Sequence, residues 1–176
     1  KSFLAAAAAT LALTLGLGAA PQAAAAQPTP KNNIVDVAVA VNDSGPFAGL
    51  FDTLIAAVGA ADPAVLKRLT SKGQSTVFAP TDDAFGALGL TPDNVGNLPQ
   101  AALTEILLYH VLPGRRDSND VLASTRLRTL QGAFLKQASG TLTDVLERQA
   151  NIIVVDVPAS NGVIHAIDAV VLPFAP

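Results

Sequence analysis

The sequence predicts an α+β fold in which helices occupy the first two thirds of the chain and strands occupy the last third. Apolar residues between 47 and 58 recur at positions i, i+3, i+4, i+7 and i+8, which is the spacing of an amphipathic helix. The stretch NGVIHAIDAVVLP at 161–173 instead joins an Asn-Gly turn to a run of mostly β-branched apolar residues, which is typical of a strand. Both faces of this terminal strand are apolar, so we expect it to be covered on both sides.

The other helices are predicted where a capping residue precedes an apolar stripe. Asp62 followed by Pro63 is a typical helix start, and Thr81 followed by two aspartates is another, because carboxylates suit the first turn of a helix. Residues 34–41 fit either a short helix or a strand, and we favour the helix. The predicted helices are 34–41, 47–58, 63–73, 81–88 and 100–110.

Short apolar runs separated by turn residues predict the strands. They lie at 75–78, 127–130, 133–137, 142–146 and 152–157. Residues 152–155 are uninterrupted apolar, so we expect all four to be interior. By contrast, RRDSND at 115–120 is predicted to be an exposed polar loop.

Several polar residues within these elements are interpreted as structural. His165 and Asp168 are three positions apart in the terminal strand and would point to opposite faces, which argues against a His–Asp catalytic pair. His110 falls on the apolar stripe of its helix. A buried polar group without a partner costs ~1–3 kcal/mol, so each should make its own hydrogen bond. The predicted structural polar core is His110, His165, Asp168, Thr81 and Asp82.

The N-terminal 26 residues are predicted to be a secretory signal peptide, because an apolar run from Phe3 to Leu17 precedes small residues up to Ala26. An uncleaved membrane anchor is the alternative. Residues 27–32 would then be a flexible linker and 33–174 one domain, with no stable transmembrane segment in the mature chain. The protein would be secreted, periplasmic or held at the cell surface.

Composition narrows the functional classes further. The chain has no cysteine, which excludes disulfides, a thiol nucleophile and cysteine metal sites. The formal net charge of −3 gives no electrostatic reason to expect nucleic acid as a partner. We also find no GxSxG motif, and only two histidines occur in the sequence. We therefore predict no catalytic site, no metal and no cofactor.

Two groups of charged residues carry alternative interpretations. Asp82 and Asp83 invite an acid–base or metal-binding hypothesis, although starting a helix explains both. Four arginines fall within fourteen residues and form a local basic region that is either a solvated loop or a site for an anionic carbohydrate or phosphate. These arginines are Arg115, Arg116, Arg126 and Arg128.

Three stretches together resemble the fasciclin domain family. STVFAPTDDAFGAL at 75–88 is similar to its first signature stretch, LYHVLPG at 108–114 to its tyrosine–histidine stretch, and NGVIHAIDAVVLP at 161–173 to its second signature. The resemblance covers about 33–174. It implies a wedge-shaped β-sandwich with several helices packed along one edge, in a secreted or surface protein that mediates adhesion.

The resemblance also implies partner-binding residues. In animal members such as periostin-like proteins, the tyrosine–histidine stretch and an Asp-Ile pair before the second signature are implicated in integrin binding. Tyr109 and His110 match the first by identity. Asp156 and Val157 match the second approximately, with Val in place of Ile.

Three functional hypotheses follow. The first is a secreted adhesion or matrix-interaction module that binds a protein or carbohydrate through surface patches, without catalysis. The second is an anionic polysaccharide or small-ligand binding protein that uses the arginine-rich region at 115–128. The third is an enzyme that uses Asp82, Asp83 or Asp168, which would need two carboxylates ~5–10 Å apart in one cleft if it hydrolysed glycosides.

Overall fold

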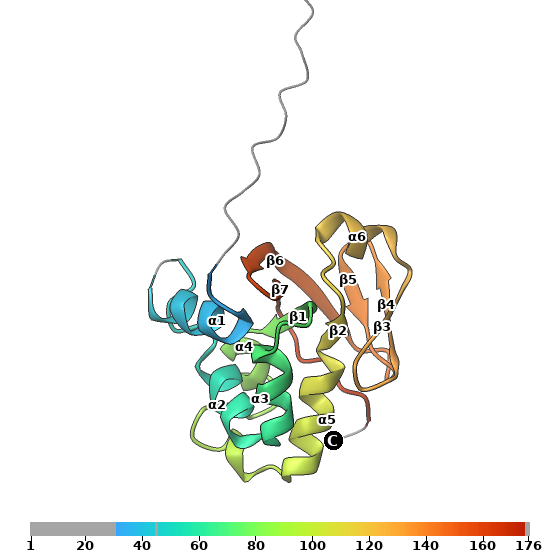
Figure 1. The fold of residues 1–176 in the computed structure, drawn as a ribbon. Coiled ribbons are helices and arrows are strands. Elements are labelled where there is room, and N and C mark those ends of the chain that lie inside the picture. The colour runs from blue at the N-terminus through green and yellow to red at the C-terminus, as the bar shows by residue number, and fades with distance from the viewer. Residues whose placement is uncertain (1–30, 45, 175–176) are drawn as a thin grey trace, which may run out of the picture.

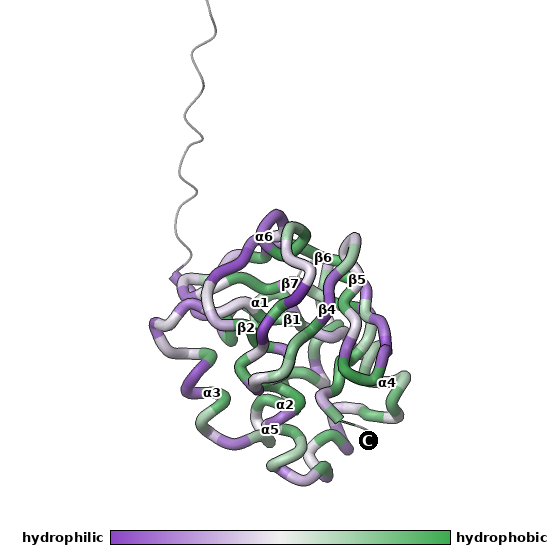
Figure 2. Tube along the Cα trace, turned by 90° about the vertical axis from the view of Figure 1, so that its right-hand side faces the viewer, coloured by the Kyte–Doolittle hydropathy of each residue, from purple (hydrophilic) through white to green (hydrophobic). Residues whose placement is uncertain are grey.

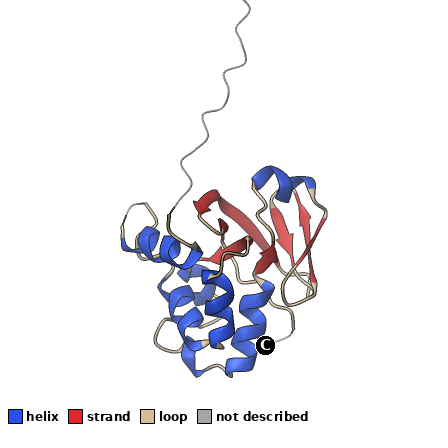
Figure 3. Cartoon of the chain, in the orientation of Figure 1, coloured by secondary structure: helices blue, strands red, loops and turns tan. Residues whose placement is uncertain are grey.

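The computed structural model describes residues 31–44 and 46–174. The predicted signal peptide and residues 27–30 of the predicted linker lie outside these residues. The elements are α1 (Ile34–Asp43), α2 (Asp52–Ala60), α3 (Pro63–Thr70), β1 (Ser75–Pro80), α4 (Asp82–Gly86), the 3-10 turn η1 (Val95–Asn97), α5 (Gln100–Tyr109), β2 (Val111–Pro113), α6 (Ser118–Ala123), β3 (Arg126–Arg128), β4 (Phe134–Ala138), β5 (Thr141–Thr143), β6 (Gln149–Ala159) and β7 (Gly162–Ile167). Helices α1 to α5 gather on one side of the strands, and α6 lies apart from them beside β4 and β5 (Figures 1 and 3).

Seven strands form one hydrogen-bonded sheet in the order β2-β1-β7-β6-β5-β4-β3. β1 and β7 are parallel, with Ser75 opposite Gly162 and Pro80 opposite Ile167, and the other neighbouring strands are antiparallel. The pairing of β6 with β7 shifts register twice, once on each side of Val154. Such bulges bend a strand and increase its twist. The long, bent β6 therefore belongs to both halves of the sheet.

Two hydrophobic clusters lie on opposite faces of β1 and β7. Val77 and Ile164 belong to the cluster that packs against the helices. Phe78 and Ile167 point to the opposite face and belong to the second cluster. The second half of the sheet contributes Leu127, Leu135 and Leu142 to this cluster. In Figure 2 hydrophilic residues mark the loop that leads to α6 and the end of α3, while the central strands are mainly hydrophobic. The predicted α+β fold is confirmed, and β7 is covered on both sides.

The start of the second predicted helix was wrong. The helix begins at Asp52 and not at residue 47. The preceding residues form a turn in which Gly49 has φ 69°. This turn is fixed by Asn42, whose side-chain oxygen accepts a hydrogen bond from the Phe51 amide at 2.8 Å and whose carbonyl accepts one from the Gly49 amide at 2.9 Å. The helix predicted at 34–41 is confirmed as α1.

The terminal strand also ends earlier than predicted, at Ile167. Beyond it, two backbone amides bond to side chains instead of a neighbouring strand. Val171 donates to Nε2 of His110 at 3.3 Å, and Leu172 donates to a carboxylate oxygen of Asp144 at 3.1 Å. These bonds satisfy buried amides without a ladder, so the chain leaves the sheet while its side chains stay in the core.

Three expectations for the last third were wrong. Residues 115–120 are not entirely loop, because α6 begins at Ser118 with Asp117 as its N-cap. The strand predicted at 142–146 is β5, which ends at Thr143. Residues 152–155 are not all interior, since Ile153 and Val155 are 52% and 49% exposed. Both exposed residues alternate with the half-buried Ile152 and Val154, because successive side chains of a strand point to opposite faces.

Candidate functional sites

The tyrosine–histidine pair lies inside the domain. Tyr109 is fully buried, and its hydroxyl donates a hydrogen bond to the carbonyl of Phe134 at 3.1 Å. Burial, reinforced by the negative charge of Asp144, raises the pKa of Tyr109 to about 12. A partner could reach this side chain only if the domain opened.

His110 is 2% exposed and ends helix α5. Its Nδ1 lies 2.8 Å from the carbonyl of Ile106, and its Nε2 accepts from the amide of Val171 at 3.3 Å. These partners assign the proton to Nδ1 in a neutral ring. Burial lowers the pKa of His110 to about 4, although the Ile106 hydrogen bond and the charge of Asp144 act in the opposite direction. The imidazole therefore joins α5 to the segment after β7.

A partly buried ion pair close to this histidine has no counterpart among the predicted site residues. The side chain of Asp144 is fully buried and lies 2.8 Å from Nη2 of Arg148 and 2.9 Å from its Nε. The carboxylate also accepts from the amides of Leu146, Arg148 and Leu172. The spacing of an aspartate four residues before an arginine is the one sequence signal that could have pointed to it.

Asp156 lies on the surface and fixes the start of α6. It has φ 59°, and its carboxylate accepts from the amide of Ser118 at 2.8 Å and from the Ser118 hydroxyl. Its own amide donates to Nδ1 of His165 at 3.2 Å. Val157, its neighbour, is half-buried against the helical core. The aspartate implied by the resemblance as a partner contact is thus already engaged within the domain.

His165 is completely buried in β7, as its place in the predicted polar core requires. Its Nε2 lies 3.0 Å from the carbonyl of Arg116. Since Nδ1 accepts from Asp156, the proton belongs on Nε2, so this ring is the opposite tautomer from His110. His165 joins β7 to the loop after β2.

The remaining residues of the predicted polar core accept hydrogen bonds from backbone amides. Thr81 is buried and caps α4, with its hydroxyl 3.4 Å from the amide of Ala84. Asp82 is half-buried and accepts from the amides of Asp52 at 3.2 Å and Thr53 at 2.8 Å, so it caps α2 from thirty residues away. Asp168 was predicted to be part of the polar core, but it is exposed. Its carboxylate accepts a hydrogen bond from the backbone amide of Asn151 at 2.6 Å.

The four arginines have different roles. Arg115 donates from Nη1 to the carbonyl of Gly162 at 2.8 Å and to that of Ala159 at 3.3 Å, which ties the loop after β2 to the turn between β6 and β7. Arg116 contributes its backbone carbonyl to His165. Arg126 and Arg128 are both exposed on one face of β3. Nothing in the described contacts joins the first pair to the second.

A basic and aromatic face is formed where β3 pairs with β4. Arg126 lies opposite Lys136, and Arg128 opposite Phe134, with all four side chains exposed. The guanidinium carbon of Arg126 is 4.3 Å from the centre of the Phe134 ring, a cation–π contact. A broad groove runs from this face to Val145 and Glu147. We call the four residues Arg126, Arg128, Phe134 and Lys136 the β3–β4 face.

Two further features concern residues 31–44 and 46–174, the part of the chain that the structure describes. Within that part of the chain, histidine and carboxylate side chains nowhere gather in threes that could hold a metal ion. No helix there has the length and apolar character needed to cross a membrane.

The sequence of this chain is similar to a known domain family and to individual proteins of that kind. The Fasciclin domain family matches residues 49–173. Protein sll1483 of Synechocystis sp. is 43% identical over 132 residues, which cover 70% of this chain and 67% of that protein. Immunogenic protein MPB70 of Mycobacterium bovis is 31% identical over 158 residues, which cover 90% of this chain and 72% of that protein.

A solved structure supports the same assignment at the level of the fold. It is a FAS1 domain pair from the insect cell adhesion molecule Fasciclin I, with a TM-score of 0.61 and 17% sequence identity. The match covers 81% of this chain and 51% of that one, so this chain spans about half of the pair. Because the family match includes most of the chain and both signature stretches, this protein belongs to the fasciclin domain family.

Proposed function

We propose that this protein is an exported interaction module that binds a protein or carbohydrate partner through its outer surface and catalyses no reaction. The observation that carries the proposal is the position of the polar signature residues. Tyr109, His110 and His165 are buried and hydrogen-bonded to backbone groups. These residues hold the domain together, so recognition falls to side chains that remain outside.

The carboxylates considered for catalysis support the same view. Both oxygens of Asp82 accept hydrogen bonds from backbone amides, and those of Asp168 accept from the backbone amide and the side-chain amide of Asn151. Asp83 is exposed in the first turn of α4, where its charge suits the helix N-terminus. A general acid or base needs a carboxyl group free to reach a substrate proton.

We place the partner contact on the β3–β4 face. Arginine and aromatic side chains are enriched where protein interfaces carry most of their binding energy. Here Arg126 and Phe134 contact each other, which pre-orders both side chains before a partner arrives. The backbone of this face is held by the antiparallel pairing of β3 with β4. The face is also far in sequence from the predicted export signal.

The test compares two variants that each remove one cation. Arg126→Ala removes the cation and its contact with Phe134, whereas Lys67→Ala removes an exposed cation from α3. Both proteins and the parent would be immobilised and exposed to envelope, matrix and culture-medium fractions from the native host. We expect the parent and Lys67→Ala to retain the same partner and Arg126→Ala to lose at least tenfold in affinity. Absence of any retained partner on the parent would refute the proposal.

A second candidate function is binding of an anionic polysaccharide by the same face. It is favoured by the three cations of the face, although Lys136 forms an ion pair with Glu147 at 2.6 Å. Arg115 is not expected to take part, because its guanidinium already bonds to two carbonyls. Titration with alginate and with neutral dextran distinguishes the two functions. Salt-sensitive shifts of β3 and β4 amide signals with alginate alone would support the polysaccharide.

A further inference from the structure

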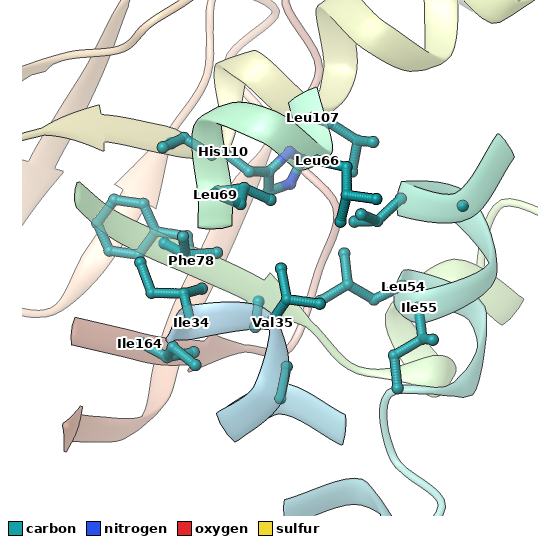
Figure 4. A pocket seen from close by; sticks show the side chains of 16 residues that line it. Ile34, Val35, Leu54, Ile55, Leu66, Leu69, Phe78, Leu107, His110 and Ile164 are labelled. Carbon is teal, nitrogen blue, oxygen red and sulfur yellow. The ribbon is translucent and has the colours of Figure 1, made fainter. Parts of the chain in front are cut away.

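We infer that the helical half of the domain holds a binding site for a small, neutral, apolar molecule. The cavity has a volume of about 230 Å³ and lies between α1, α2, α3 and α5 on one side and the face of β1 and β7 on the other. Figure 4 shows side chains from all four helices around the same space, with Phe78 and Ile164 at its left. This site is separate from the β3–β4 face, so it does not depend on the proposed partner.

The lining offers a ligand no free polar group. Of the sixteen lining residues, fifteen are apolar or glycine, and the sixteenth is His110. Both nitrogens of that ring are already bonded to the backbone, to Ile106 and Val171. Water needs about two to four polar partners to occupy a cavity, so this space favours an apolar occupant. A charged or hydroxylated group at its floor would lose its hydration without a replacement.

The walls of the cavity are fixed by a polar clamp outside it. Asn161 accepts from the amide of Ile34 at 2.8 Å and donates to the carbonyl of Leu69 at 2.7 Å. Ile34 and Leu69 both line the cavity, from α1 and α3. Asn161 is 4% exposed, so these bonds are shielded from water. A space held open by buried hydrogen bonds is pre-formed, as ligand sites usually are.

The size of the space sets the size of the ligand. An engineered cavity of about 150 Å³ lined by similar residues binds benzene. By proportion, the larger space here accommodates about eight to ten carbon atoms. The rim includes Leu66, which is 40% exposed, and Gly59, so a ligand can enter between α2 and α3. One polar end of the ligand could remain in water at this rim.

The test uses 1-octanol and 1,8-octanediol as a matched pair, followed by methyl signals in two-dimensional NMR. We expect 1-octanol to bind with a dissociation constant at or below about 1 mM and to shift the methyl signals of Val77, Leu69 and Ile164. The diol should bind at least tenfold more weakly, because its second hydroxyl would meet the apolar floor. Equal binding of the two, or no shifts with 1-octanol, would overturn the inference.

Two glycine variants locate the site. An added Cβ at Gly59 or at Gly86 meets nothing within 4 Å, so a side chain can leave the backbone at both positions. Gly59→Phe places a ring at the rim, whereas Gly86→Phe in α4 is remote from the lining. Gly59→Phe should abolish 1-octanol binding with little change in melting temperature, and Gly86→Phe should bind as the parent does. Retained binding in Gly59→Phe, or shifts at another apolar cavity whose lining includes Leu88 and Leu98, would contradict the assignment.

Discussion

His110 shows how one buried ring makes the stability of the domain depend on pH. Its folded pKa is about 4, against an ordinary value of 6.5, because burial disfavours the charged ring. Between these values the unfolded chain binds a proton that the folded chain does not, so stability rises with pH. The contribution is complete above about pH 6.5 and is lost as the pH falls toward about 4.

The expected size of this effect is on the order of 3 kcal/mol, since one pKa unit corresponds to about 1.4 kcal/mol. Urea unfolding of the parent and of His110→Gln at several pH values would measure it. Gln lacks an ionisable ring, so its unfolding free energy should fall less steeply below about pH 6.5. Parallel pH profiles for the two proteins would contradict the assignment.

Asp144 should be the most costly single carboxylate to remove. Asp144→Ala would leave three backbone amides and the guanidinium of Arg148 without their acceptor. Breaking a buried pair from one side typically costs about 3–5 kcal/mol. Lys136→Ala, which breaks the exposed pair with Glu147, is the control and should cost less than about 1 kcal/mol. Urea denaturation would compare them, and similar losses would argue against a central role for Asp144.

At the scale of elements, α2 depends on a cap from a distant part of the chain. Its own N-cap residue, Phe51, makes no capping bond, and Asp82 supplies both acceptors. Asp82→Ala should therefore destabilise the domain by about 1–2 kcal/mol. Asp83→Ala removes the same charge from the first turn of α4 but no backbone acceptor, and should cost less. Equal melting temperatures for the two variants would show that the cap is unimportant.

The parallel pairing of β1 with β7 depends on a glycine. A Cβ at Gly162 would overlap the carbonyl oxygen of Ser75 and lie 2.8 Å from Cδ1 of Ile34. Gly162→Ala should therefore cost about 3 kcal/mol or more, because backbone atoms cannot turn aside as a side chain can. Gly86→Ala meets no neighbour and should be neutral or stabilising. Thermal unfolding would separate them, and a Gly162→Ala protein as stable as its parent would refute the close approach.

Local signals explain which elements the sequence predicted. The caps at Asp62 and Thr81 act within three residues, and both mark real helix starts. By contrast, the start of α2 depends on Asn42 and Asp82, and the end of β7 depends on His110 and Asp144. The bonds of Asp82, His110 and Asp144 join residues 28 to 61 positions apart, and that of Asn42 spans nine, so the residues of each element alone do not reveal them.

At the scale of the whole molecule, the helical and strand halves share the same two central strands. Val77 and Ile164 face the helices, and Phe78 and Ile167 face the second half of the sheet. The alternation itself predicted that β7 would be covered on both sides. Its parallel partner β1 lies more than eighty residues earlier and could not be identified from periodicity alone. The long-range pairing of β1 with β7 determines the topology of the sheet, and the alternation of side chains assigns residues to the two hydrophobic clusters.

The candidate sites also divide into features that the sequence could predict and features that only the fold reveals. Burial of His110 and His165 follows from their places on apolar stripes, and both rings lie inside. Asp168 is exposed because the strand ends one residue before it. The β3–β4 face arises only when Arg126 and Phe134 are brought together by the pairing of β3 with β4, so the sequence could show its arginines but not the aromatic ring between them.

The central claim is that the signature residues form the interior of the domain and that partners meet its outer surface. Nitrogen NMR of the histidine rings across a pH titration tests it most directly, because it reports both tautomer and protonation. We predict that His110 carries its proton on Nδ1 and stays neutral as the pH falls from about 8 to about 5, in keeping with a pKa of about 4. An imidazole at this position that exchanges with water and becomes charged near its ordinary pKa of 6.5 would contradict the account.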